Sequence, residues 1–153
     1  FRSYTTKFND VPEVEEDVCI PFGRARIVAE GADITVVTNS MMTIKAEKAV
    51  RQLQKEGISA ELIDLRTIVP LDTETIIRSV KKTGKLLIVD EGHLSFGITG
   101  EIASRIMPDV FYDLDAPIQR MGTADVPLPF SPALEFPLIP DEKKIAAKIR
   151  EMV

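Results

Sequence analysis

Residues 85–107, KLLIVDEGHLSFGITGEIASRIM, decide the fold of this chain. The stretch opens with four consecutive apolar residues at 86–89, a run typical of a strand buried on both faces of a parallel sheet. Residues 90–92 are expected to end that strand, and a glycine-rich loop follows. Apolar residues at helical spacing predict the next helix, which Pro108 is expected to stop. Strand, loop and helix in this order form half of a parallel crossover unit.

Further strand patterns flank this stretch on both sides. Residues 23–30 alternate charged with apolar side chains, as in an edge strand with one wet face. The β-branched run at 34–38 favours a central strand. Two more strands are expected at 59–66 and 118–121, while five prolines between 127 and 140 predict an irregular segment.

Helix patterns alternate with these strands. The first helix has Asn39 or Ser40 as its candidate cap and Gly57 as its end. Its apolar stripe consists of Met42, Ala46, Ala49, Val50 and Leu53. Asp72 is expected to cap the next helix, and Asp141 the last one. The alternation predicts a three-layer α/β/α sandwich around a mostly parallel sheet. Only a few residues join the first two strands, so the first should run antiparallel.

Composition excludes several classes of function. The net charge of −5 argues against nonspecific nucleic-acid binding, which needs basic surface. No apolar run approaches the length of a membrane span, so no membrane partner is expected. The single cysteine, Cys19, predicts no intrachain disulfide, no zinc site and a reducing compartment, and we expect it to pack at the domain edge.

Catalytic motifs are missing from the glycine-rich loop. Its glycines do not form the G-x-G-x-x-G fingerprint or a P-loop, so no cofactor-binding or catalytic residues are assigned. His93, the only histidine, is either a general acid or base or a hydrogen-bonded surface group. Glu91 lies two residues before it. Glu91 and His93 are candidates for a loop at the mouth of an active site, because a loop at the carboxyl end of a central strand could reach it. The segment around Asp125 is the second candidate for a functional edge.

Three stretches, residues 20–38, 57–92 and 114–135, carry a resemblance to a known family. The pair DLRT and PLD, with the later DVPLP, is its most specific part. The chain resembles the C-terminal domain of the β subunit of thiamine-diphosphate-dependent 2-oxo acid dehydrogenases, of the pyruvate, branched-chain 2-oxo acid or acetoin type. The resemblance implies a five-stranded mixed sheet with the first strand antiparallel. It also implies that residues 1–20 are a linker from a pyrimidine-binding domain and that residues 21–153 form the transketolase C-terminal-like domain.

The resemblance places the chemistry of the parent enzyme outside this domain. Thiamine diphosphate and magnesium would be held elsewhere by a Gly-Asp-Gly segment, which this sequence lacks. The implied partners are an α subunit or fused α portion, a second β subunit across a two-fold axis, and the subunit-binding domain of the dihydrolipoyl acyltransferase. Asp125 and the carboxylate of Val153 correspond to the positions used for that docking. The implied location is the cytoplasm, or the mitochondrial matrix in a eukaryote.

A hypothesis from another class stays open at this point. The acidic linker and the missing catalytic motifs also fit a stand-alone interaction or regulatory module of flavodoxin-like architecture. A pyrimidine-binding domain encoded upstream would favour the first hypothesis, and a start codon near residue 1 would favour the second.

Overall fold

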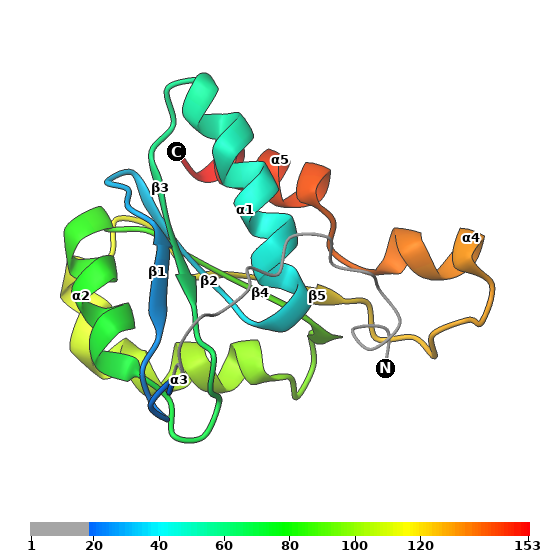
Figure 1. Ribbon diagram of the computed structural model, residues 1–153, viewed down its shortest axis with the longest axis horizontal. Helices are drawn as coiled ribbons and strands as arrows, with labels where there is room; N and C mark the ends of the chain where they lie inside the picture. The colour runs from blue at the N-terminus through cyan, green and yellow to red at the C-terminus, as the bar shows by residue number, and fades with distance from the viewer. Residues whose placement is uncertain (1–18) are drawn as a thin grey trace.

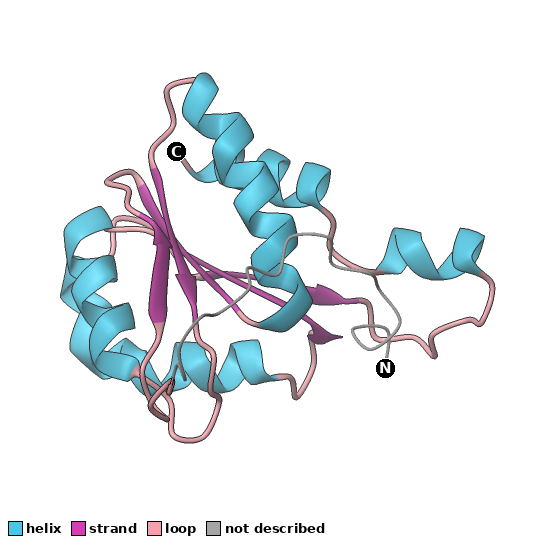
Figure 2. Ribbon diagram, in the orientation of Figure 1, coloured by secondary structure: helices cyan, strands magenta, loops and turns pink. Residues whose placement is uncertain are grey.

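The computed structural model describes residues 19–153, which form a twisted sheet between two layers of helices (Figures 1 and 2). The strands are β1 Arg26–Ala29, β2 Ile34–Thr38, β3 Ala60–Asp64, β4 Leu86–His93 and β5 Gln119–Thr123. The helices are α1 Ser40–Lys55, α2 Thr73–Thr83, α3 Ile98–Val110, α4 Pro132–Glu135 and α5 Glu142–Met152. Short 3-10 turns, η2 Phe111–Asp113 and η3 Phe136–Leu138, follow α3 and α4. The linker expected at residues 1–20 lies almost wholly outside the described residues.

The strand order β1-β3-β2-β4-β5 confirms the expected fold class, an α/β fold with a five-stranded mixed sheet. Strand β2 is central and pairs in parallel with β3 and β4, and β4 pairs in parallel with β5. Strand β1 lies at one edge and runs antiparallel to β3, as predicted. Its link to β2 is too short for the crossover that a parallel pair requires.

Two hydrophobic clusters fill the two sides of the sheet. Helices α1 and α5 cover one face, and α2 and α3 cover the other. Every residue of β2 is buried, as the β-branched run predicted. The five residues predicted for the inner stripe of α1 are the five that the structure buries. Periodicity therefore identified the faces that make up the core.

Helix ends follow the predicted chemistry in three of four cases. The side chain of Asp72 accepts a hydrogen bond from the Thr75 amide at 3.1 Å, and Asp141 caps α5 in the same way. Gly57 has φ +88° and ends α1, while the Ile58 amide donates to the Leu53 carbonyl. In the fourth case the predicted position is confirmed, since Asn39 is the N-cap residue of α1, but its side chain makes no capping hydrogen bond.

Two expected boundaries around the central stretch are wrong. Strand β4 continues through residues 90–92 to His93, because a second contact with β5, between His93 and Thr123, resumes the ladder after an irregularity. Helix α3 continues through Pro108 to Val110. Pro108 lies in the last turn of α3, where the missing N–H removes only one intrahelical hydrogen bond.

Smaller differences concern the flanks of the domain. Strand β5 begins and ends later than predicted, at Gln119 and Thr123. The proline-rich segment contains the short helix α4, which begins at Pro132, where proline suits a first helical turn. Cys19 is exposed and not packed at the domain edge.

Candidate functional site

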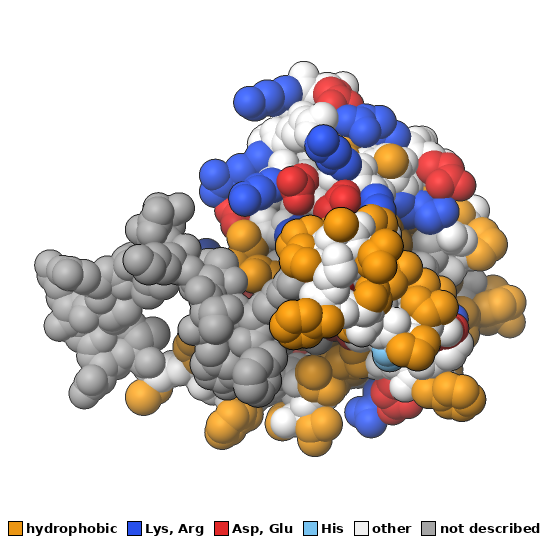
Figure 3. Space-filling model, turned by 90° about the vertical axis from the view of Figure 1, so that its right-hand side faces the viewer, with side chains coloured by type: hydrophobic (Ala, Val, Ile, Leu, Met, Phe, Trp, Pro, Cys, Tyr) orange, Lys and Arg blue, Asp and Glu red, His pale blue; other side chains and the backbone are white. Residues whose placement is uncertain are grey.

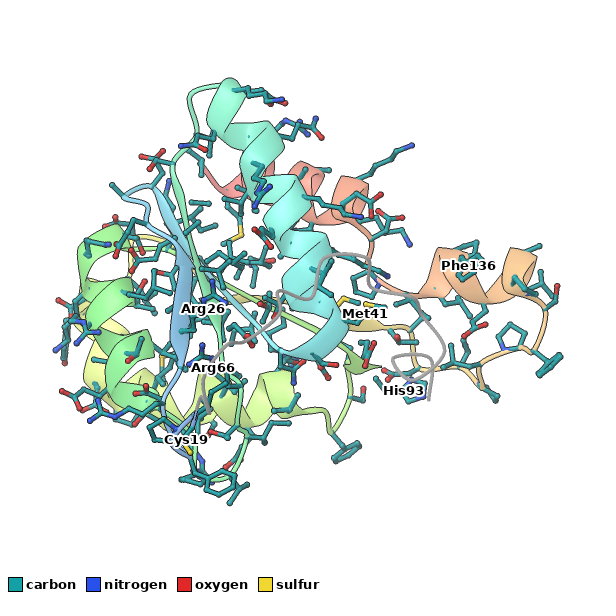
Figure 4. All side chains as sticks on the ribbon, viewed as in Figure 1. Cys19, Arg26, Met41, Arg66, His93 and Phe136 are labelled. Carbon is teal, nitrogen blue, oxygen red and sulfur yellow. The ribbon has the colours of Figure 1, made fainter. Side chains whose placement is uncertain are left out.

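The two candidate edges named from the sequence meet at the carboxyl ends of β4 and β5. His93 is the last residue of β4 and pairs with Thr123, the last residue of β5. The loop from β4 to α3 and the segment from β5 to α4 therefore start side by side. Figure 4 shows His93 on the same side of the molecule as the segment that leads to α4. Loops at this end of a parallel sheet are the usual position for functional residues.

His93 and Ser95 form hydrogen bonds that join the two segments. The imidazole Nδ1 of His93 lies 2.9 Å from the carbonyl oxygen of Ala124. Because a carbonyl only accepts, Nδ1 is the donor, and in the neutral ring Nε2 keeps its lone pair. The Ser95 amide donates to Oδ1 of Asp125 at 3.1 Å, and the Ser95 hydroxyl donates to Oδ2 at 2.5 Å. We call these four residues the Asp125 cluster.

Asp125 is exposed, and hydrogen bonds favour the ionised form of its carboxylate. The hydroxyl of Ser95, then its amide, and then the nearby His93 ring hold the pKa of Asp125 below its usual value. Slight burial acts in the opposite direction. Hydrogen bonds that favour the charged form of a carboxyl group lower its pKa in this way. The cluster therefore presents an ionised carboxylate at the surface.

Close backbone packing fixes the loop that carries Ser95. A Cβ at Gly97 would lie 2.1 Å from the carbonyl oxygen of His93, so only glycine fits there without a shift of the chain. The hydroxyl of Thr123, which is buried, donates to the carbonyl oxygen of Glu91 at 2.7 Å. The side chain of Glu91 itself is exposed. Glu91 thus contributes its backbone to the joint between the strands.

Sequence reasoning named His93 and Asp125 separately and missed both their proximity and the part played by Ser95. Ser95 and Asp125 are 30 positions apart in the chain. The contact depends on the pairing of β4 with β5 and on the late end of β4. A single serine in a glycine-rich loop carries no signal for such a contact.

Val153 lies at the other end of the sheet. The ammonium group of Lys85, just before β4, is 3.4 Å from the Val153 carbonyl oxygen. Strand β4 has eight residues and so spans about 26 Å. Within one copy of the chain, Asp125 and Val153 are therefore far apart.

A cavity of about 530 Å³ opens at the neighbouring strand ends. It is lined by Ile20, Phe22, Asn39, Ser40, Asp64, Arg66, Thr67 and Ile68. Exposed apolar side chains, among them Phe22 and Ile68, border it, and Arg66 is exposed as well. Figure 4 shows Arg66 near the edge strand that carries Arg26. Arginine beside exposed aromatic and aliphatic groups is typical of a protein contact surface.

The described residues do not fit thiamine diphosphate with its magnesium ion. Within residues 19–153 no three His, Cys, Asp or Glu side chains gather closely enough to hold a metal ion. The sequence lacks the Gly-Asp-Gly segment.

Comparison with known proteins defines the family. The family model described as transketolase, C-terminal domain, matches residues 23–145. The chain belongs to this family. Its sheet order, its antiparallel first strand and the helices on both faces are the fold of that domain.

Two curated relatives come from 2-oxo acid dehydrogenases. The chain is 47% identical over 143 residues to the pyruvate dehydrogenase E1 component subunit beta of Rickettsia felis, covering 94% of this chain and 43% of the relative. It is 40% identical over 152 residues to the 2-oxoisovalerate dehydrogenase subunit beta of Bacillus subtilis, covering 99% of this chain and 46% of the relative. The chain thus spans less than half the length of these relatives.

A solved structure agrees with both findings. The protein described as a split gene transketolase, inactive beta4 tetramer, superposes with a TM-score of 0.75 and 28% identity. The match covers 93% of this chain and 45% of that one. Among the described residues, no helix combines the length and the apolar character needed to cross a bilayer.

Proposed function

We propose that this chain is the C-terminal domain of the β subunit of a 2-oxo acid dehydrogenase and that it provides subunit contacts and a docking site. The observation that carries the proposal is 40–47% identity to such β subunits over almost the whole chain. The parent enzyme would decarboxylate a 2-oxo acid oxidatively on thiamine diphosphate and pass the acyl group to a lipoyl group. Its cofactor, its magnesium ion and its substrate contacts would lie in other domains and in an α partner.

An exposed apolar surface supports the role in subunit contacts. Side chains between β5 and the end of α4 remain exposed, with Phe130 fully so and Leu134 63% exposed. Figure 3 shows hydrophobic side chains gathered on this face of the molecule, with the histidine among them. Apolar groups exposed together in this way commonly mark an interface between proteins. The β chains of the related transketolase form a tetramer by its description, which is consistent with pairing of this domain with a second copy.

The ionised carboxylate of Asp125 supports the role in docking. It lies beside the apolar surface, in a segment stiffened by Pro127 and Pro129. A basic group on the subunit-binding domain of the dihydrolipoyl acyltransferase is the partner that we propose for it. Opposite charges across an interface raise the association rate and fix the register. If Val153 contributes to the same site, it does so from the second copy, because the two residues of one copy lie at opposite ends of the sheet.

Surface plasmon resonance of the assembled dehydrogenase on an immobilised subunit-binding domain tests the docking role. We expect Asp125→Asn to weaken binding and to flatten its dependence on salt concentration, because one charge pair is lost. Asp109→Asn, which changes another exposed aspartate, this one on α3, is the matched control and should bind as the wild type does. If Asp125→Asn keeps both the affinity and the salt dependence of the wild type, Asp125 is not part of the docking site.

A further inference from the structure

We propose that Ser95 is a positioning residue that orients the carboxylate of Asp125 toward a cationic group of the docking partner. This inference rests on the docking function proposed above. Ser95, which lies in the β4–α3 loop, would thus help to form the recognition surface that Asp125 presents from the β5–α4 segment.

The geometry of the contact carries the inference. Ser95 donates from two atoms, its amide and its hydroxyl, and each donor takes a different oxygen of Asp125. Two donors from one residue fix both the position and the plane of a carboxylate, in the manner of a bidentate contact. Meanwhile His93 holds the carbonyl oxygen of Ala124, the residue just before Asp125. Ser95 therefore positions the side chain of Asp125, and His93 positions the backbone just before it.

The loop that supplies these donors is itself held in place. The required glycine at Gly97 and the bond from Thr123 to the Glu91 carbonyl fix its two ends. In addition, the guanidinium group of Arg120 donates to the carbonyl oxygen of Leu94 at 3.3 Å. The donor pair of Ser95 is thus presented by backbone that has little freedom, so the orientation of Asp125 is set before any partner arrives.

Such an arrangement suits recognition of a guanidinium or ammonium group. Each carboxylate oxygen has two acceptor positions, and Ser95 occupies one position on each oxygen. The remaining positions are available for a cation, since Asp125 is exposed. Orientation in the free protein removes rotamer entropy that binding would otherwise cost. The hydrogen bonds also keep the group ionised, which the cation requires.

If the contact between Ser95 and Asp125 has only a local structural role, a different result is expected. If Asp125 only ties the two loops together, removal of the Ser95 hydroxyl alters the local structure but leaves docking unchanged. Two readouts on Ser95→Ala therefore separate the roles. One is the pKa of the Asp125 carboxyl group, followed by carbon-13 NMR on the 153-residue chain. The other is the affinity of the assembled dehydrogenase for the isolated subunit-binding domain.

We expect Ser95→Ala to raise the pKa of Asp125 toward its ordinary value and to weaken docking by about fivefold, which is the size of the net contribution of one ordinary hydrogen bond. Ser95→Thr keeps the hydroxyl and should restore both values. Ser104→Ala, at an exposed serine on α3, is the matched control and should change neither.

Wild-type affinity in Ser95→Ala would overturn the inference, whether or not the pKa of Asp125 moves. An unchanged pKa would overturn it as well, because the hydroxyl would then not act on the carboxylate. Failure of the wild-type assembly to bind the subunit-binding domain at all would instead overturn the proposed docking function.

Discussion

The side chain of Asp72 links helix α2 to the residue just before strand β1. One of its oxygens accepts the Thr75 amide and so caps α2, while the other accepts the Ala25 amide at 2.8 Å, just before β1. The Thr75 hydroxyl donates to the second oxygen as well. Among residues 19–153, the side chain of Asp141 at the start of α5 makes only the capping contact with the Lys144 amide. The two residues therefore form a matched pair, in which one aspartate has an added link to the edge strand.

We predict that Asp72→Ala lowers the free energy of unfolding by about 1–2 kcal/mol, within the range for loss of an N-cap. Asp141→Ala should cost less, because no amide outside its own helix loses a partner. Urea unfolding of both variants and of the wild type measures the difference. Equal costs for the two variants would show that the bond to Ala25 adds nothing to stability.

The same carboxylate gives a pH dependence with a definite sign. Burial would raise the pKa of Asp72, but the hydrogen bonds from the Ala25 and Thr75 amides outweigh it and hold the pKa below its usual value. A group with a lower pKa in the folded state stabilises the fold above its unfolded pKa, about 3.9 for aspartate. This contribution is lost as the pH falls through the folded-state pKa.

We therefore expect the difference in unfolding free energy between the wild type and Asp72→Asn to stay constant from about pH 7 to 5. Below about pH 4 the difference should shrink, because the unfolded wild type takes up a proton on Asp72 at a higher pH than the folded protein does. Urea unfolding at four pH values across this range measures it. A difference that grows on acidification would contradict the assigned direction of the pKa shift.

Residue-level prediction from sequence succeeded where the contacts are local. Asp72 and Asp141 each act on an amide three positions ahead, so the spacing alone identified both caps. The bond from Asp72 to Ala25 spans 47 positions, and that from Ser95 to Asp125 spans 30. Such contacts depend on which strands pair. No local pattern in the sequence encodes them.

Among the helices and strands, β4 shows most clearly what the sequence could predict, because its start was predicted correctly and its end was not. Its apolar start was predicted because burial on both faces leaves an unbroken run. Its end was misplaced because Asp90, Glu91 and Gly92 have the composition of a loop. Pairing with β5 overrides that composition, and it brings His93 beside Thr123.

Two glycines near this end of β4 predict opposite effects of the same substitution. A Cβ at Gly97 would lie 2.1 Å from the carbonyl oxygen of His93, whereas one at Gly100 would meet only the tip of the Arg120 side chain at 3.1 Å. We expect Gly97→Ala to destabilise the chain by about 1–3 kcal/mol through overpacking. Gly100→Ala, inside α3, should be neutral or stabilising by up to about 1 kcal/mol. Thermal unfolding compares them, and a stable Gly97→Ala would show that the loop can move.

At the scale of the whole molecule, the apolar surfaces at the carboxyl end of the sheet fit a domain that works within a larger assembly. One surface borders the cavity beside Phe22 and Ile68, and another includes Phe130 and Leu134. The relatives that the chain matches are more than twice the length of the aligned region. The domain fold was predictable because its elements are strongly periodic. The apolar surfaces were not predictable, because the exposed apolar residues do not recur at a regular spacing in the sequence.

The proposal to be tested first is that this chain belongs to the β subunit of a 2-oxo acid dehydrogenase. Its most direct test is the oxidation of pyruvate and of 2-oxoisovalerate by the full-length protein that contains this chain, purified with its α partner. Thiamine diphosphate, magnesium and an artificial electron acceptor are supplied. We expect that at least one of these substrates is oxidised and that its oxidation requires both thiamine diphosphate and the α partner. If neither substrate is oxidised by the loaded assembly, or if no α partner binds, the claim is contradicted and a stand-alone interaction module explains the domain better.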